Sequence, residues 1–242
     1  MKSELKIIEE VQNGLKQNNL YTGNFISNIK SLKIKQFDLG INRVEGLYSI
    51  KDNEILVSDI NNKNVIRHEL VHCASSDLDL TKISIYSGVV TGQGTTMYFD
   101  HEPHGKALNE GITDYIAYKI FMNEGIEYKF CDTYKKLSLV SCMLSSIVGA
   151  NEFDNTFLEG NGILFRRMLI NSFDEDFIDK LYYVTDKYLQ AVSGELAFSL
   201  FWKHEFNKCL KIIKNEYNSL NNQDYKNEII KQDLEKKAKI LK

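Results

Sequence analysis

Apolar residues recur every three to four positions through most of the chain, which is the spacing of one face of an α-helix. The pattern predicts a first amphipathic helix over residues 3–18. It does not decide between a short helix and a strand for residues 25–36. Further helices are predicted over 63–75, 106–123, 133–149, 154–170, 174–191, 194–217 and 223–241.

Short runs rich in β-branched and aromatic residues interrupt this helical pattern and indicate strands. Two hairpins are predicted, one from strands 47–50 and 54–58 and one from strands 83–90 and 95–99. Their turns would be Lys51-Asp52-Asn53 and Thr91-Gly92-Gln93-Gly94. The strands all precede the main run of helices, so the sequence predicts an α+β fold. Residues 1–124 would form a mixed part, and residues 125–242 an all-α part.

Composition narrows the functional classes. The chain has 242 residues, enough for a sizeable core, and a net charge of -3, so no basic surface points to a nucleic-acid partner. No apolar run is long enough to span a membrane, and the polar N-terminus does not resemble a secretory signal. The four cysteines lack C-x-x-C spacing and are expected to be reduced and buried: Cys73, Cys131, Cys142 and Cys209. These features predict a cytoplasmic protein with no membrane partner.

The predicted helix 63–75 contains His68-Glu69-Leu70-Val71-His72, an H-E-x-x-H pattern. Helical residues four apart share a face, so His68 and His72 would lie one turn apart. Two neutral imidazoles at that spacing can hold one metal ion, and Glu69 could reach a water molecule held by it. The alternative is a pair of core histidines with ordinary hydrogen-bond partners.

A third metal ligand must come from elsewhere in the chain. The metzincin pattern would place a histidine six residues after His72 and a glycine three residues after it. Leu78 and Ser75 occupy those positions. The metzincin branch is therefore excluded.

Further along, at Asn109-Glu110-Gly111-Ile112-Thr113-Asp114, the chain resembles the gluzincins, the thermolysin-like clan of zinc peptidases. In that clan H-E-x-x-H is followed by a second helix bearing N-E-x-x-[ST]-[DE]. The resemblance implies that Glu110 is the third zinc ligand and that Asp114 hydrogen-bonds a ligand histidine. Their spacing agrees, because residues four apart share a helical face. The resemblance covers about residues 45–120, and the gap between the motifs is longer than in thermolysin.

The resemblance also implies a fold and an activity. Residues 1–124 would be zincin-like, with a small mixed sheet and the two motif helices, and an active-site cleft would separate them from residues 125–242. One Zn²⁺ per chain, held by His68, His72 and Glu110, would serve hydrolysis of a peptide or protein, with Glu69 as general base. The strand Glu54–Ser58 would be the edge strand that binds substrate backbone.

The residue that stabilises the oxyanion is not identified by the sequence. Candidates in the helical half are His204, Tyr134, Arg166 and Arg167, and His101 and His104 could line the rim of the cleft. For each of these residues, the alternative is a structural role with no part in the chemistry.

Two other functions stay open. One is a non-catalytic zincin-fold binding or regulatory protein, although keeping Glu69 and all three ligands argues against it. The other is a narrow-specificity regulatory or toxin-like protease. A purely structural zinc site fits poorly, because such sites close with four protein ligands and favour cysteine. The oligomeric state is not predicted.

Overall fold

The computed structural model of the chain describes residues 2–37, 45–79, 90–99, 102–194 and 199–219. Within these ranges the protein is mixed α/β and mostly helical, with small three-stranded sheets, as the sequence predicted at this coarse level. The elements in chain order are α1 (Lys2–Gln17), α2 (Gly23–Asn28), β1 (Lys33–Gln36), β2 (Gly46–Ser49), β3 (Glu54–Val57), α3 (Lys63–Ala74), β4 (Val90–Gln93), β5 (Thr96–Phe99), β6 (Glu102–His104), α5 (Lys106–Asn123), α6 (Lys135–Val148), α7 (Ala150–Leu158), α8 (Gly162–Ile170), α9 (Glu175–Val192) and α10 (Ser199–Ser219).

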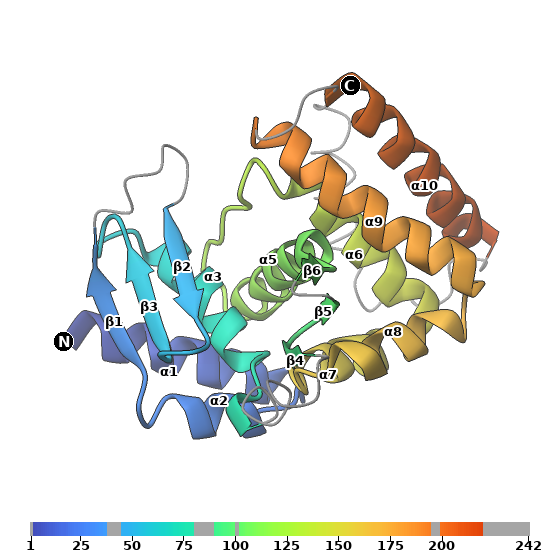
Figure 1. Cartoon of the computed structure of the whole chain (residues 1–242). Helices are drawn as coiled ribbons and strands as arrows, with labels where there is room; N and C mark the ends of the chain where they lie inside the picture. The colour runs from blue at the N-terminus through green and yellow to red at the C-terminus, as the bar shows by residue number, and fades with distance from the viewer. Residues whose placement is uncertain (1, 38–44, 80–89, 100–101, 195–198, 220–242) are drawn as a thin grey trace.

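The first sheet has the order β1-β3-β2, with β1 parallel and β2 antiparallel to β3 (Figure 1). β3 alternates in burial, with Ile55 and Val57 in the core, because successive side chains of a strand point to opposite faces. α3 packs against β2 and β3. The predicted edge strand 54–58 is wrong: β3 is hydrogen-bonded on both sides, and β2 is the edge strand that lies next to α3.

The second sheet, β4-β5-β6, is antiparallel. The predicted strand 83–90 lies outside the described residues except for Val90. The predicted turn 91–94 is wrong, because residues 91–93 belong to β4 and the turn falls at Gly94 and Thr95. Gly94 has φ +51, a conformation that glycine adopts at no steric cost. β6 was not predicted, since its central Pro103 is tolerated only on an edge strand such as this one.

The second sheet connects α3 to α5. The Gly94 N–H donates to the Ser75 carbonyl at the end of α3, at 2.8 Å, and Thr95 N–H donates to Asn109 Oδ1 on α5, at 3.3 Å. The start of α5 is held by Asp186 of α9, whose carboxylate accepts from the N–H groups of Gly105 and Ala107, both at 2.8 Å. Two separate parts of the chain therefore fix the position of α5.

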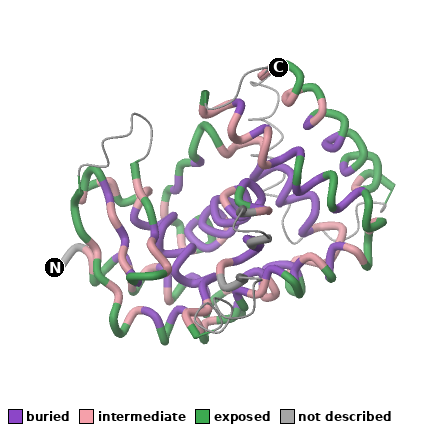
Figure 2. Tube along the Cα trace, viewed as in Figure 1, coloured by how far each residue is buried: buried purple, intermediate pink, exposed green. Residues whose placement is uncertain are grey.

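α5 is the central helix, buried along nearly its whole length (Figure 2). It packs against α1 and α3 on one side and against α6 and α9 on the other. The approach to α6 requires Gly111, because a β-carbon there would lie 2.6 Å from Leu137 Cβ and 2.7 Å from its carbonyl carbon. A side chain at position 111 would thus push α6 away from α5.

One helix prediction needs correction, and one undecided segment is resolved. The predicted helix 154–170 is divided into α7 and α8, because Gly160 has φ +74 and Asn161 caps α8 by accepting from Leu164 N–H at 3.2 Å. Residues 25–36 contain both of the structures considered for them, α2 ending at Asn28 and then β1. Part of the predicted helix 194–217 and all of the helix 223–241 lie outside the described residues. No described helix is both long and apolar enough to cross a membrane.

Candidate metal centre

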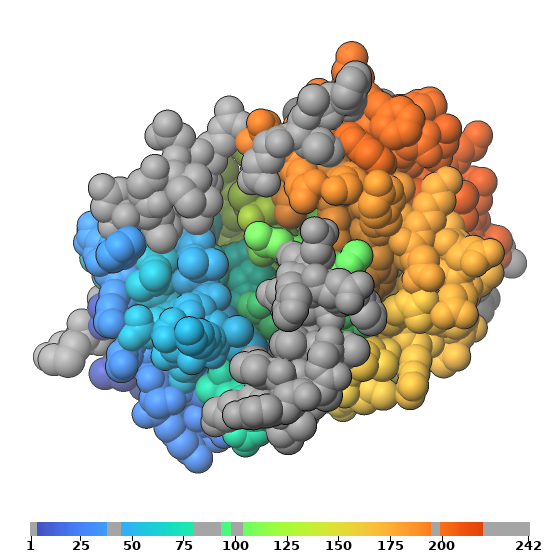
Figure 3. All heavy atoms as spheres, in the orientation of Figure 1, coloured from blue at the N-terminus to red at the C-terminus, as the bar shows by residue number. Residues whose placement is uncertain are grey.

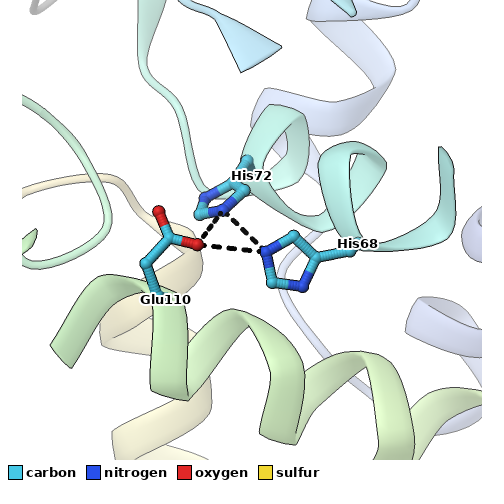
Figure 4. A group of neighbouring side chains, drawn as sticks. All are labelled: His68, His72 and Glu110. Carbon is cyan, nitrogen blue, oxygen red and sulfur yellow. Dashed lines mark hydrogen bonds and ion pairs between the residues drawn. The ribbon is translucent and has the colours of Figure 1, made fainter. Parts of the chain in front are cut away.

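α3 carries two histidines into the interior. Its N-terminus is capped by Asn62, whose side chain accepts from Val65 N–H at 3.4 Å. One turn apart on this helix, His68 and His72 are 8% and 4% exposed. Both rings point toward α5, and Glu110 points back from α5 toward them (Figure 4).

Three ligand atoms form a nearly equilateral triangle. His68 Nε2 lies 3.1 Å from His72 Nε2, and Glu110 Oε2 lies 3.2 Å from the first and 3.3 Å from the second (Figure 4). Ligand atoms about 2.0–2.1 Å from a tetrahedral zinc ion stand roughly 3.3 Å from one another. This group could therefore hold one metal ion.

The charges of the group favour a cation. Burial opposes ionisation of Glu110, but the nearby His72 and His68 outweigh it and hold the pKa of Glu110 below its usual value. Burial also opposes the charged form of His68, whose pKa is nevertheless raised by the carboxylates of Asp114 and Glu110. A proton on His68 would have to leave when a metal binds, because only the neutral imidazole is a ligand.

Asp114 sets the tautomer of His68. Its Oδ1 lies 3.4 Å from His68 Nδ1, and an ionised carboxylate only accepts hydrogen bonds. The ring proton of neutral His68 therefore sits on Nδ1, which leaves the Nε2 lone pair facing His72 and Glu110. The carboxylate is fully buried in the helix interface.

His72 has its own partners on α5. Its Nδ1 lies 3.2 Å from Thr113 Oγ1 and 3.2 Å from the Asn109 side-chain amide. The Thr113 hydroxyl can accept the Nδ1 proton, which again leaves Nε2 free for a metal. Sequence reasoning gave no role to Asn109 or Thr113. The signal was present, because their four-residue spacing repeats that of Glu110 and Asp114 one position earlier.

Glu69 is 6% exposed and lies beside the ligands without belonging to the triangle. Burial raises the pKa of Glu69, while His72 and His68 oppose that rise. The backbone of Tyr48 in β2 also acts to lower the pKa of Glu69. A buried carboxylate held next to a metal site is suited to accept a proton.

Of the candidate oxyanion donors, Tyr134 lies at the centre. Its ring stacks on His68, with centroids 5.7 Å apart and an interplanar angle of 22°. The negative charge of Glu110 and then burial raise the pKa of Tyr134, so its hydroxyl stays protonated and able to donate.

The other candidates lie elsewhere or outside the described residues. Arg166 pairs with the exposed Asp179 and Glu175. Arg167 and His204 are exposed on α8 and α10. His104 is half-buried in β6, and His101 lies outside the described residues. Arg166 therefore has the structural role that was its alternative, since its guanidinium is engaged by exposed carboxylates.

The cysteines are all free, as expected. Cys73, Cys142 and Cys209 are buried, but Cys131 is exposed, so that part of the prediction is wrong. Cys131 lies in the irregular connection between α5 and α6.

Around the centre, a recess separates the N-terminal sheet from α9 in the space-filling view, and atoms in the colours of α3 and α5 are set back within it (Figure 3).

Comparison of the chain with protein-family models, with curated proteins and with solved structures found no match. The candidate centre therefore rests on the chain's own residues: two imidazole nitrogens and one carboxylate oxygen within bonding reach of a single ion.

Proposed function

We propose that this chain is a zinc-dependent metallopeptidase of the gluzincin type, with a zincin-like catalytic part. The observation that carries the proposal is the triangle of His68, His72 and Glu110 with Glu69 at its side. The ligands come from two separate helices, α3 and α5. Each ligand histidine also has a polar partner on α5 at its Nδ1, the ring nitrogen that faces away from the ligand triangle. Such support is typical of a metal ligand, because it fixes the ring and raises its basicity.

Zinc fits this donor set. Two imidazole nitrogens and one carboxylate oxygen are a ligand set of catalytic zinc sites, in which the fourth position is open to water or substrate. Structural zinc sites instead close with four protein ligands. The group found among the described residues has three, which favours the catalytic class.

The chemistry follows from the residues around the ion. Bound zinc lowers the pKa of water and polarises the scissile carbonyl. Glu69 accepts the proton of the attacking water and passes it to the leaving nitrogen. Tyr134, whose ring lies against His68, donates a hydrogen bond from its hydroxyl to the developing oxyanion.

The substrate is a peptide or protein in extended form, and β2 is the strand that receives it. β2 is an edge of the first sheet, and it lies close to Glu69, because a β-carbon at Gly46 would be 2.8 Å from Glu69 Oε1. A peptide that pairs with an edge strand gains main-chain hydrogen bonds and is delivered in a fixed register. β2 thus takes the role that the sequence suggested for β3.

The test combines zinc analysis with cleavage of a peptide library. Wild-type protein should hold one zinc per chain and cleave peptides. Glu69→Gln should keep the zinc and lose turnover by two orders of magnitude or more, which is the typical contribution of a general base. Glu216→Gln, an exposed residue of α10, is the matched control and should behave as wild type. Full activity in Glu69→Gln would refute the mechanism.

Two alternatives remain as outcomes of this experiment. Cleavage confined to one or a few library sequences would identify a narrow-specificity regulatory or toxin-like protease. Zinc uptake with no cleavage of any peptide would favour a non-catalytic binding protein. The position of Glu69, buried and oriented beside the ligands, favours the enzyme.

A further inference from the structure

Asp114 is the meeting point of several hydrogen bonds in the interior. Its Oδ1 accepts from the Tyr128 hydroxyl at 2.6 Å and lies 3.4 Å from His68 Nδ1. Its Oδ2 accepts from Cys131 N–H at 3.1 Å and from the Ser138 hydroxyl at 3.3 Å. The side chain is fully buried, so these contacts replace water around the carboxylate.

Most of these donors come from one segment of chain. Tyr128 and Cys131 lie in the irregular connection between α5 and α6, and Ser138 lies in the first turns of α6. The Ser138 hydroxyl is shared with the Tyr134 carbonyl, at 3.1 Å. The segment fixed at Asp114 is therefore the one that brings Tyr134 onto the His68 ring.

Tyr128 makes the shortest of these contacts. It is 5% exposed, and its ring stacks on Phe121 at 5.8 Å between centroids and meets Phe130 edge-on at 6.2 Å. This packing fixes the direction of the hydroxyl, which also lies 3.5 Å from His68 Nδ1. Tyr128 and His68 thus share the same carboxylate oxygen.

We propose that Tyr128 is a positioning residue of the metal centre. Its hydroxyl holds Asp114 in the orientation that serves His68, and it anchors the segment that carries Tyr134. The inference rests on the proposed function in so far as the centre binds zinc. It adds that a residue outside both sequence motifs controls how firmly the ligand histidine and the oxyanion donor are placed.

The substitution Tyr128→Phe tests this with little change of shape, because only the hydroxyl is lost. Without the Tyr128 hydroxyl, Asp114 Oδ1 keeps only its contact with His68. The segment between α5 and α6 also loses its shortest hydrogen bond to Asp114 of α5. Loss of a partner behind a metal ligand typically costs 10- to 100-fold in affinity or activity. We expect zinc release about tenfold faster, and kcat about tenfold lower with KM unchanged.

Tyr115→Phe is the matched control. Tyr115 is the next residue on α5, is fully buried and hydrogen-bonds Ser145 at 3.0 Å, on the side of the helix away from the ligands. Tyr115→Phe also removes one buried tyrosine hydroxyl, at a similar cost in stability. Zinc release from folded protein to a chromophoric chelator is measured for both variants, together with hydrogen exchange of the Cys131 amide in zinc-free protein.

Faster zinc release and weaker Cys131 protection in Tyr128→Phe, with neither change in Tyr115→Phe, support the proposal. Wild-type values in Tyr128→Phe, or equal changes in both variants, overturn it. If Tyr128→Phe does not fold, Ser138→Ala probes the same carboxylate, and unchanged zinc release with unchanged Cys131 protection overturns the proposal. A wild-type chain that takes up no zinc overturns this inference and the proposed function together. A chain that holds zinc but cleaves nothing refutes the proposed function alone.

Discussion

The backbone of Tyr48 in the edge strand β2 lies against the carboxylate of Glu69, the residue between the two histidines, and acts to lower the pKa of that carboxylate. The other end of Tyr48 is also fixed, because its hydroxyl donates to Asn53 Oδ1 at 2.9 Å. The β2-β3 hairpin and the candidate base therefore hold each other in place. Under the proposed function, a strand in this position would align the peptide with the carboxylate of Glu69.

Gly46 should be needed for this contact. A β-carbon at position 46 would lie 2.4 Å from Val65 Cγ1 and 2.8 Å from Glu69 Oε1, so Gly46→Ala must displace either β2 or the carboxylate. We expect roughly tenfold lower kcat with a full zinc content, since misplacing a reacting group by a fraction of an ångström is costly.

The double variant Gly46→Ala/Val65→Ala is the control for Gly46→Ala. It relieves the contact with Val65 and should recover part of the lost turnover. Steady-state kinetics gives the kcat of both variants, and metal analysis gives their zinc content. Wild-type turnover in Gly46→Ala would show that β2 does not fix Glu69.

Metal removal should lower thermal stability, because a bound ion stabilises only the folded chain. At a free zinc concentration 100 times its Kd, the gain is about 2.7 kcal/mol, which corresponds to roughly 5–10 °C in Tm for a chain of this size. Glu110→Ala should have a Tm below that of the zinc-bound wild type, and a chelator should not lower it further. Glu216→Ala should respond to the chelator as wild type does. Calorimetry measures both, and a wild-type Tm that a chelator leaves unchanged would contradict zinc binding.

Lys119 of α5 and Asp154 of α7 form a buried ion pair, with Nζ 2.5 Å from Oδ2 and side chains 12% and 0% exposed. Lys119→Met leaves the carboxylate without its partner and should cost about 3–5 kcal/mol of unfolding free energy. Asp154→Leu should cost less, because the lysine can extend toward solvent. The double variant should be close to wild type, as measured by urea denaturation.

Asp154 also gives the Lys119→Met variant a pH dependence. Burial raises the pKa of Asp154 and Lys119 opposes that rise, so without the lysine the protonated form is favoured further. The penalty of Lys119→Met should therefore shrink as the pH falls toward 4. A penalty that does not change between pH 4 and 7 would contradict the assigned cause.

Asp186 should give the wild-type chain a pH-dependent stability of its own. Burial raises the pKa of Asp186 above its usual value, although the N–H groups of Ala107 and Gly105 and the nearby His104 and Lys106 oppose this. Because the folded pKa is the higher one, the contribution of Asp186 is full below the unfolded value and is lost as the pH rises through the folded pKa. Asp186→Asn should flatten that part of the stability curve and, at neutral pH, cost about 1 kcal/mol for one lost cap. Denaturation from pH 4 to 7 tests both.

Helices with a clear apolar period were predicted well, and α5 begins and ends where expected. Failures occurred where local pattern does not decide. Strand order depends on pairing between segments distant in sequence, so nothing local showed that β3, rather than β2, is central. The division of α7 from α8 depends on the backbone conformation of Gly160, although Asn161 offered a cap signal.

The site shows the same division between local and distant information. His68, His72, Glu110 and Asp114 could be selected together because each pair has helical spacing. Tyr128 could not be selected, since it lies in an irregular segment and meets Asp114 only through the path of the connection. The approach of β2 to Glu69 could not be predicted for a similar reason, because it is made by the backbone of a segment distant in sequence.

The burial of α5 has an evolutionary consequence. A helix enclosed on all sides, with Gly111 against α6 and its ligand face against α3, has almost no position that can change without repacking a neighbour. β2, by contrast, lies at the edge of its sheet and leaves Leu47 48% exposed. Under the proposed function, selection could thus alter which peptides β2 accepts while α5, with its proposed metal ligand, stays constant.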